Sequence, residues 1–489
     1  MVTMKEYDLI VIGSGSPMNI VEPMIQENPK IRIAVIDKDE PGGICLTRGC
    51  IPSKIMLYPA ELVRTMERAG ELGIELKIQE VSYEKVMKRM RSIIDSDINS
   101  IREGLSSSEN IDYYPAKAEF VSPYTLQVNG ETIRGKMLFL GTGSRAIIPP
   151  IKGLDKVRYH TSDSIIRMEL RTLPKSMAII GGGYIAAEFG HFFAAMGSKV
   201  TIIGRNPQFL PEEEPEISIL AKRELGRHMT ILTGHEVREV EATPSGTKKL
   251  LARETRTGRM TPLDAEEILI AAGRGPENDI LHPERAGIKT TPEGWIDVDE
   301  YLATSQPNVW AFGDADGKYL FRHVANYESE IVYYNAVLKR KAKVDYHAIP
   351  HAVFTYPEIA SVGLKEREAV QKHGEAKILI GFYRYEDTAK GEAMNVKDYF
   401  VKVILLVDSM KILGAHIIGP YASILIQEII NLMYTSDQSA RPMQDAIHIH
   451  PALNEVVQRA FGSLMSPKQY RHMLGHHELA ATEAPSHDS

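Results

Sequence analysis

The sequence predicts an α/β protein that contains two similar units, followed by a separate α+β domain. An apolar, β-branched segment, Tyr7 to Ile12, runs directly into a glycine-rich turn, Gly13 to Met18. The same order recurs from Ser176 to Ile180, which Gly181 to Gly183 follow, and from about Tyr346 the pattern becomes α+β. A strand, a glycine-rich turn and a helix in this order are typical of a Rossmann-like dinucleotide-binding unit. Two such units predict two dinucleotide sites.

Bulk composition is that of a multidomain globular protein. A chain of 489 residues exceeds what one hydrophobic core supports, so roughly two to four domains are expected. The net charge of -7 disfavours nucleic acid as a partner. No apolar run reaches the ~18 residues of a spanning helix, and a strand starts almost at once, which leaves no room for a signal peptide. We expect a cytoplasmic protein with no membrane partner and no metal site.

The first unit continues with a helix and a second strand, Ile31 to Ile36, which ends on Asp37. A carboxylate at this place accepts both hydroxyls of a ribose, as the adenosine of FAD requires. Met18 stands where the fingerprint has its third glycine, so the helix is expected to be displaced. Pro17 suits the first turn of that helix, whereas Pro23 should kink it.

The second unit lacks the acidic residue that binds the ribose of NAD. Its helix runs through Met196, and its second strand, Lys199 to Ile203, is followed by Gly204 and Arg205. Glycine offers no side chain for ribose hydroxyls, and arginine can pair with a 2′-phosphate. NADP is therefore favoured, while a solvent-facing Arg205 with use of either NAD or NADP remains the alternative.

The other predicted elements support these two units. A helix is expected from about Ser82 to Leu105. After it, strand-like material ends in Met137 to Leu140 with Gly141 to Ser144. Two further segments are expected to return to the nucleotides: Glu267 to Ala271 with Gly273, and Asn308 to Phe312 with Gly313 and Asp314. In the C-terminal part, a strand is expected near Val401 to Leu406 and a helix from about Ser423 to Met433.

The only two cysteines of the chain, Cys45 and Cys50, lie five positions apart. In a straight helix this spacing would place their Cα atoms roughly 8 to 9 Å apart, whereas a disulfide tolerates at most about 7 Å. A bridge therefore needs a distorted helix, which Gly42, Gly43 and Gly49 could supply. A redox-active pair is favoured in a cytosolic protein, and two buried thiols that never bond are the alternative.

The segment from Gly42 to Lys54, which carries both cysteines, closely resembles the active-site segment of dihydrolipoamide dehydrogenases and their relatives. These form the class I pyridine nucleotide-disulfide oxidoreductase family, and the resemblance covers nearly the whole chain, from Tyr7 to about Leu474. It implies an FAD-binding domain over 1–148, an NAD(P)-binding domain over 149–275, a central domain that completes the FAD site over 276–345 and a dimer-interface domain over 346–474. Residues 475–489 are expected to be a disordered tail.

The resemblance also implies the roles of the site residues. Cys45 is the interchange thiol, Cys50 is the charge-transfer thiol beside the flavin, and Lys54 pairs with Glu188. His450 and Glu455 match the catalytic base and its orienting carboxylate, which would act on the disulfide of the other subunit of a homodimer. A histidine suits proton transfer near neutral pH. The His450–Pro451 bond could be cis.

Further site residues follow from the units and the resemblance together. For FAD they are Gly13, Gly15, Asp37, Gly43, Lys54, Gly143, Gly313 and Asp314. For NAD(P) they are Gly181, Gly183, Tyr184, Arg205 and Gly273, with the ring of Tyr184 gating entry of the nicotinamide. Taken singly, Lys54, Glu188, Tyr184 and His450 could equally be ordinary surface or core residues.

The resemblance predicts a dihydrolipoamide dehydrogenase that oxidises dihydrolipoamide, free or on a lipoyl domain, through Cys45, Cys50 and FAD to NAD(P)+, with a part in cell redox homeostasis. An NADPH-dependent reductase of another small disulfide is the nearest alternative. Mercuric reductase is disfavoured because no cysteine follows Cys50. A catalytically inactive structural subunit of a 2-oxoacid dehydrogenase complex is disfavoured because the Cys45/Cys50 and His450/Glu455 pairs are both intact.

Overall fold

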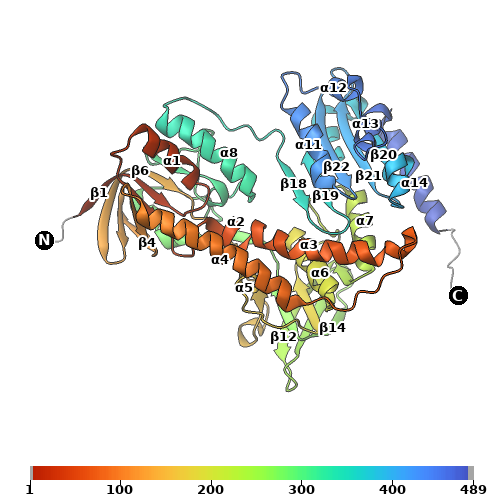
Figure 1. Cartoon of the computed structure of the whole chain (residues 1–489), viewed down its shortest axis with the longest axis horizontal. Coiled ribbons are helices and arrows are strands. Elements are labelled where there is room, and N and C mark those ends of the chain that lie inside the picture. Colours follow the sequence, from red (N-terminus) through yellow and green to blue (C-terminus); the bar gives the residue numbers. More distant parts are fainter. Residues whose placement is uncertain (1–3, 483–489) are drawn as a thin grey trace.

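The structure, a computed structural model, describes residues 4–482, with side chains described as far as residue 475. Figure 1 shows three regions: an N-terminal sheet region with α1 and α8, a second sheet region below the long helices α3 and α4, and a C-terminal sheet region with α11, α13 and α14. This arrangement confirms the predicted fold class. Within residues 4–482, no helix is long and apolar enough to cross a membrane.

The first unit is a seven-stranded sheet with the strand order β3-β2-β1-β6-β5-β4. The seventh strand, β17, pairs with the last residues of β6, beyond the part that pairs with β5. Its strands β1, β2, β3, β6 and β17 are parallel, and β4 and β5 are antiparallel. The bounds are β1 Lys5–Ile12, β2 Ile33–Ile36, β3 Ile111–Tyr114, β4 Ala118–Ser122, β5 Thr125–Val128, β6 Glu131–Leu140 and β17 Val309–Ala311. The second strand therefore starts two residues later than predicted, at Ile33.

The second unit repeats this topology. Its parallel sheet has the order β11-β10-β9-β15-β8, so the run β11-β10-β9-β15 corresponds to β3-β2-β1-β6 of the first unit. Its strands are β8 His160–Thr161, β9 Ser176–Ile180, β10 Lys199–Gly204, β11 Thr230–Thr233 and β15 Glu267–Ile270. A three-stranded antiparallel sheet is attached to it, with β12 His235–Ala242, β13 Lys248–Glu254 and β14 Met260–Ala265.

The glycine that follows the first strand makes the same contact in both units. Gly13 has φ +90°, and a Cβ on it would lie 2.0 Å from the carbonyl oxygen of Gly141 at the end of β6. Gly181 has φ +141°, and a Cβ on it would lie 2.0 Å from the carbonyl oxygen of Ala271 after β15. Both the positive φ and the close backbone approach exclude any other residue. The shared contact supports the prediction of two equivalent turns.

Helix α1 (Met18–Glu27) starts at the position that lacks the third glycine. Pro17 is its N-cap and Pro23 lies inside it without ending it. Pro17 packs against Gly141, where an added Cβ would lie only 2.4 Å from the proline Cγ. Room for the start of this helix is thus supplied by the glycine at the end of the neighbouring strand.

Three helices join the two units. The predicted helix is α4 (Tyr83–Ser107), and α3 (Cys50–Glu67) runs beside it. Helix α6 (Tyr184–Met196) of the second unit packs on both, since the ring of Tyr83 lies about 6 Å from the rings of Phe192 and Phe193. Shorter elements here are α2 Gly43–Arg48, α5 Ser162–Ile166, α7 Pro215–Gly226, β7 Ser144–Ala146 and β16 Arg274–Pro276.

The segment predicted as a central domain packs on the first unit. Its strand β17 extends the first sheet, and its helix α8 (Arg322–Val332) lies beside α1. Asn19 of α1 donates hydrogen bonds to Asn326 and to the Ser329 hydroxyl of α8. Residues far apart in sequence therefore form one wall around the glycine-rich turn.

The C-terminal region is a six-stranded antiparallel sheet with the order β18-β19-β22-β21-β20-β23. Its strands are β18 Pro350–Val353, β19 Ile359–Gly363, β20 Ile378–Arg384, β21 Phe400–Leu406, β22 Ile412–Ile418 and β23 Leu464–Met465. Its helices are α9 Glu366–His373, α10 Ala389–Ala393, α11 Ala422–Met433, α12 Arg441–Asp445, α13 Glu455–Gly462 and α14 Pro467–Thr482. Residues 475–482 of the predicted tail are therefore helical, and its last residues, 483–489, lie outside the described part of the chain.

Candidate functional site

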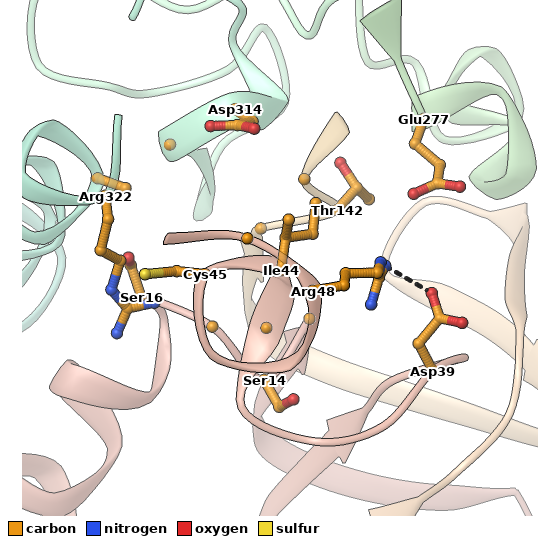
Figure 2. Close-up of a pocket in the computed structure, with 18 of the residues that line it drawn as sticks. Ser14, Ser16, Asp39, Ile44, Cys45, Arg48, Thr142, Glu277, Asp314 and Arg322 are labelled. Atoms are coloured by element: carbon orange, nitrogen blue, oxygen red, sulfur yellow. Dashed lines mark hydrogen bonds and ion pairs between the residues drawn. The ribbon is translucent and has the colours of Figure 1, made fainter. Parts of the chain in front are cut away.

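One cavity lies between the two units and contains both cysteines. Its wall includes the Gly13–Pro17 turn, the end of β2 at Asp37, the segment from Gly43 to Lys54, and the start of α6 at Tyr184. The segment from Phe312 to Asp314 and the start of α8 at Arg322 complete it. Figure 2 shows Cys45, Ser16 and Arg322 at one end and Arg48, Asp39 and Glu277 at the other.

The helix that carries the cysteines is broken between them. Helix α2 ends at Arg48, Gly49 has φ -132° and ψ -117°, and α3 begins at Cys50. A Cβ on Gly49 would lie 2.8 Å from the carbonyl oxygen of Ile44 and 3.2 Å from the Cα of Cys45. The break thus lets the two cysteine segments approach more closely than a straight helix would allow, as the spacing predicts.

Both cysteines are free thiols in this structure. A hydrogen bond from Cys50 lowers the pKa of Cys45 to about 7 against the opposing effect of burial, and the positive charge of Arg322 lowers it further. The same hydrogen bond and burial raise the pKa of Cys50. The two shifts run in opposite directions and make Cys45 the more acidic thiol of the pair.

Lys54 and Glu188 form an ion pair across the two units. The lysine Nζ lies 3.0 and 2.9 Å from the two carboxylate oxygens of Glu188, which is buried at 5% exposure. Glu188 also accepts a hydrogen bond from the backbone N–H of Phe354, 3.0 Å away, and Lys54 lies 4.4 Å from the centre of the Phe354 ring. The pair therefore links α3, α6 and the residue that follows β18.

The glycine-rich turn of the first unit leads to Asp37 and fits FAD. Asp37 accepts hydrogen bonds from the backbone N–H and the hydroxyl of Ser14, at 2.8 and 2.6 Å. A Cβ on Gly43 would lie 2.6 Å from the Cα of Gly15, so α2 begins directly against the turn. Backbone N–H groups at the start of α1 suit a pyrophosphate, and the carboxylate suits a ribose. These residues therefore fit the pyrophosphate and the adenosine ribose of an adenine dinucleotide.

The other predicted FAD residues line the same cavity. Gly143 and Gly313 have φ +74° and +64°, and a Cβ on Gly143 would lie 2.8 Å from the Ile44 side chain. Asp314 accepts a hydrogen bond from the hydroxyl of Ser144, and burial raises the pKa of its carboxyl. All eight residues that the sequence assigned to FAD line this one cavity.

The predicted NAD(P) residues separate into two places. Tyr184, at 38% exposure, lines the cavity, and its ring centre lies 6.4 Å from that of Phe321. Burial raises the pKa of its phenol to about 12. Arg205 is exposed beyond the end of β10, and no carboxylate in the described part of the chain pairs with it. Gly204 lies close to the glycine-rich turn, since a Cβ on it would lie 3.3 Å from the Cα of Gly182, a tight contact.

The predicted base and its carboxylate lie together but away from the cavity. Nδ1 of His450 is 3.0 Å from Oε1 of Glu455, which also accepts a hydrogen bond from Arg459 at 3.3 Å. This hydrogen bond with His450 lowers the pKa of Glu455. His450 is exposed, its bond to Pro451 is cis, and it does not line the cavity that holds Cys45.

Sequence reasoning missed two arginines of the cavity wall, Arg48 and Arg322. Arg48 is buried at 7% exposure and pairs with Asp39 at 2.8 Å and with Asp163 at 3.3 Å. Its place between the two cysteines was a signal in the sequence. Arg322 carried no such signal, because only the fold brings the start of α8 to Cys45.

Known proteins resemble the chain over nearly its whole length. Residues 7–329 match the family described as pyridine nucleotide-disulphide oxidoreductase, and residues 349–461 match the dimerisation domain of that family. The chain is 34% identical to mycothione reductase of Mycobacterium tuberculosis over 468 residues, which cover 94% of this chain and 99% of that protein. It is 32% identical to dihydrolipoyl dehydrogenase of Chlamydia muridarum over 459 residues, with coverages of 92% and 95%.

A solved structure shares the fold at similar coverage. It is the Cu(II) complex of the HOCl-induced flavoprotein disulfide reductase RclA from Escherichia coli, with a TM-score of 0.83 and 26% sequence identity. The match covers 94% of this chain and 99% of the other.

Proposed function

Because the chain belongs to the pyridine nucleotide-disulphide oxidoreductase family, we propose that it exchanges electrons with a small disulfide through Cys45 and Cys50. Family membership makes it a flavoprotein that uses FAD and a pyridine nucleotide. The observation that supports this proposal best is the broken helix, which brings two free thiols together in the wall of the FAD-fitting cavity.

Each residue of the site has a proposed task. When bound, FAD supplies the carrier for two electrons between the nicotinamide and the cysteine pair. Cys45 forms the mixed disulfide with substrate, and Cys50 closes the internal disulfide. Lys54 is held by Glu188, and its positive charge partly opposes the rise in the pKa of Cys50 that the hydrogen bond with Cys45 and burial cause. Tyr184 covers the nicotinamide entrance.

The favoured direction is the reduction of a small disulfide by NADPH. Two findings support it: the relative named mycothione reductase, and Arg205, which stands unpaired where an NAD-specific unit has an acid. Oxidation of dihydrolipoamide by NAD(P)+, which the cysteine segment predicts, is the second candidate and is supported by the dihydrolipoyl dehydrogenase relative. The same site runs in both directions, so substrate and acceptor must be measured together.

A direct test compares four reactions of the purified flavoprotein. NADPH and NADH are offered with mycothione, and NAD+ and NADP+ are offered with dihydrolipoamide. Fast NADPH-dependent reduction of mycothione and slow oxidation of dihydrolipoamide would support the first candidate. The opposite pattern would support the second candidate. If the unaltered protein, like Cys45→Ser, catalysed none of the four reactions, both candidates would be contradicted.

Arg205→Ser tests the cofactor choice. Loss of one charge-assisted contact to a 2′-phosphate should raise KM for NADPH by about tenfold or more, at a cost of ~1.5 to 3 kcal/mol, and leave KM for NADH unchanged. The exposed Arg256→Ser is the control, since it also removes one charge from the second unit. Equal KM changes for both cofactors would contradict this role of Arg205.

The C-terminal match indicates a homodimer, and we propose that the two subunits share each active site. Within one chain His450 lies outside the cavity of Cys45, which supports a partner's cavity as its place of action. We retain the predicted boundaries, 1–148, 149–275, 276–345 and 346–474, as a proposal for the domains.

A further inference from the structure

The ring of Tyr184 rests against the ring of Phe321, a residue without a task in the proposed reaction. The two ring centres are 6.4 Å apart, and the ring planes are inclined by 41°. Tyr184 is the first residue of α6 in the second unit, and Phe321 is the half-buried N-cap of α8. The contact therefore joins the second unit to the segment that packs on the first unit, at the cavity that Tyr184 lines.

Two imidazole rings lie nearly parallel to the ring of Phe321. The ring of His323 is centred 5.3 Å away with an interplanar angle of 11°, and that of His351 is centred 6.0 Å away with an angle of 4°. Rings at these distances attract each other in offset-stacked arrangements. We call Phe321, His323 and His351 the ring stack. It combines residues at the start of α8 with one residue of β18.

A hydrogen bond on each imidazole holds the ring stack in place. Nε2 of His323 donates to the carbonyl oxygen of Pro350 at 2.8 Å, because a carbonyl oxygen can only accept. Nε2 of His351 lies 2.7 Å from Oε1 of Glu213, a carboxylate with 3% exposure in the segment before α7. Breaking this second hydrogen bond would leave a buried carboxylate without a partner, which is costly. Neither imidazole can therefore turn away from Phe321 without a loss of hydrogen bonding.

We propose that Phe321 is a positioning residue that holds the ring of Tyr184 across the nicotinamide entrance. This inference rests on the proposed role of Tyr184 as the cover of that entrance. Since the tyrosine ring covers the entrance, it must leave the ring stack before a nicotinamide can reach the flavin. Each entry of a nucleotide therefore breaks the contact between Tyr184 and Phe321.

The contact has two opposite effects on the reaction. It lowers the fraction of molecules that are open to the nucleotide, and the apparent affinity for the nucleotide falls by the same factor. It also keeps the entrance covered between turnovers, which limits the access of O2 to the reduced flavin. Both effects act at the nicotinamide end, so they should be equal for NADPH and NADH. A contact of Arg205 with a 2′-phosphate would instead act on NADPH alone.

The test follows reduction of the flavin by NADPH and by NADH in a stopped-flow instrument, with the flavin-to-chain ratio measured for every variant. Phe321→Leu, which removes the ring but keeps an apolar side chain, should lower the half-saturating concentration of both nucleotides by about threefold or more. It should also speed the oxidation of NADPH by O2, in which O2 takes up two electrons and two protons to give H2O2.

Two further variants complete the set. His351→Leu alters the same ring stack from β18, should act in the same direction, and carries the test if Phe321→Leu does not retain flavin. Tyr319→Leu is the control and should leave both measurements unchanged, since it removes a ring from the same loop whose partner is Tyr346, at 5.0 Å.

A double-variant cycle shows whether Phe321 acts through the tyrosine. In a Tyr184→Ala background, Phe321→Leu should change neither the half-saturating concentration nor the reaction with O2. The same shift in both backgrounds would overturn the inference, since Phe321 would then act on the nucleotide itself. An unchanged or raised half-saturating concentration in Phe321→Leu alone would also overturn it.

Two other outcomes concern the function beneath this inference. If Tyr184→Ala alone left both measurements unchanged, Tyr184 would not cover the entrance, and the proposed roles of Tyr184 and Phe321 would both be wrong. If neither nucleotide reduced the flavin of the unaltered protein, the proposed function itself would be wrong, and the inference with it.

Discussion

The carboxylate of Glu455 determines the orientation of the His450 ring. It accepts hydrogen bonds from His450 at 3.0 Å, from Arg459 at 3.3 Å and from the backbone N–H of Ala452 at 3.3 Å. These contacts fix the carboxylate at the start of α13, and the carboxylate in turn orients the imidazole. Nε2 of His450 has no hydrogen-bond partner among the described residues, and we expect it to be the nitrogen that transfers the proton.

Glu455→Gln should therefore lower kcat by on the order of 100-fold without loss of flavin, because it removes the charge that supports a catalytic base. The pKa of Glu455 is lowered, so its carboxyl stays ionised throughout the neutral range and the deficit should be constant there. Steady-state kinetics against pH measures this. His448→Gln is the control, since His448 lies two residues away and bonds only to local groups, the Ala446 carbonyl and the Met443 sulfur. A similar loss in both variants would contradict the assignment.

Most residues that sequence reasoning identified stand in a local motif. Cys45, Cys50, Asp37 and Gly13 are recognised from their immediate neighbours, and Lys54 is part of the cysteine segment. Glu188, 134 positions from Lys54, was paired with it only through the resemblance. Arg322 and its proximity to Cys45 could not be predicted, because no local pattern marks a residue whose contacts depend on the tertiary fold.

At the scale of elements, the break between α2 and α3 is the feature that determines the geometry of the redox pair. Gly49→Ala places a Cβ 2.8 Å from the carbonyl oxygen of Ile44, so α2 must move away from α3. The variant should keep its flavin but re-form the Cys45–Cys50 disulfide at least about tenfold more slowly. Thiol titration during reoxidation measures this rate.

Gly226→Ala is the matched control for that experiment. Gly226 ends α7, has no positive φ, and its added Cβ would meet no atom within 4 Å. Equal reoxidation rates in the two variants would show that the break has no role in bringing the sulfurs together.

Element boundaries were predicted well where a glycine ends a strand or a capping residue begins a helix. The strand Ser176–Ile180 is confirmed at both ends, since Gly181 terminates it, and the helix from Ser82 is confirmed at its N-cap. The helical start of the predicted tail was not expected, because its polar, histidine-rich sequence carries no apolar periodicity. The antiparallel order of the C-terminal sheet was also beyond the sequence, since strand neighbours there depend on long-range pairing.

A buried charge cluster connects the second unit with the C-terminal sheet. Lys402 of β21 is 1% exposed and contacts Glu216 of α7 at 2.6 Å and Glu366 of α9 at 2.9 Å, with Glu214 at 3.4 Å. Without this cation Glu214 and Glu216 would lose their lysine partner in a buried place, while Glu366 would keep Arg471 at 2.8 Å. Leaving buried carboxylates without their cation is far more costly than losing a surface ion pair.

Lys402→Met should therefore lower the thermal unfolding midpoint by about 5 °C or more. Scanning calorimetry of the flavin-loaded protein measures this. The exposed Lys397→Met, in the loop before β21, should leave the midpoint unchanged. An unaltered midpoint for Lys402→Met would mean that the carboxylates take up protons or water at no cost.

For the whole molecule, the decisive question is whether one active site needs two chains. A tagged heterodimer of Cys45→Ser and His450→Ala answers it, since each homodimer of these variants lacks a complete site. In the heterodimer, one site combines an intact cysteine pair with an intact histidine. It should show about half the activity of the unaltered dimer.

Inactivity of this heterodimer, with flavin retained, would place His450 and Cys45 in the same subunit and contradict the shared site. A dimer in which both subunits carry Cys45→Ser and each carries a different tag is the control that measures contaminating activity.

Gly13 and Gly181 each lie against a backbone carbonyl at the end of a neighbouring strand, so a side chain at either position would disrupt one glycine-rich turn. The two turns lie on separate sheets, so a side chain at one leaves the other intact. Electron transfer through the protein needs both turns, and either one can be disabled by substitution without the other. We expect a side chain at Gly181 to leave a flavin that cannot exchange electrons with the pyridine nucleotide, and a side chain at Gly13 to leave a nucleotide-binding unit without flavin.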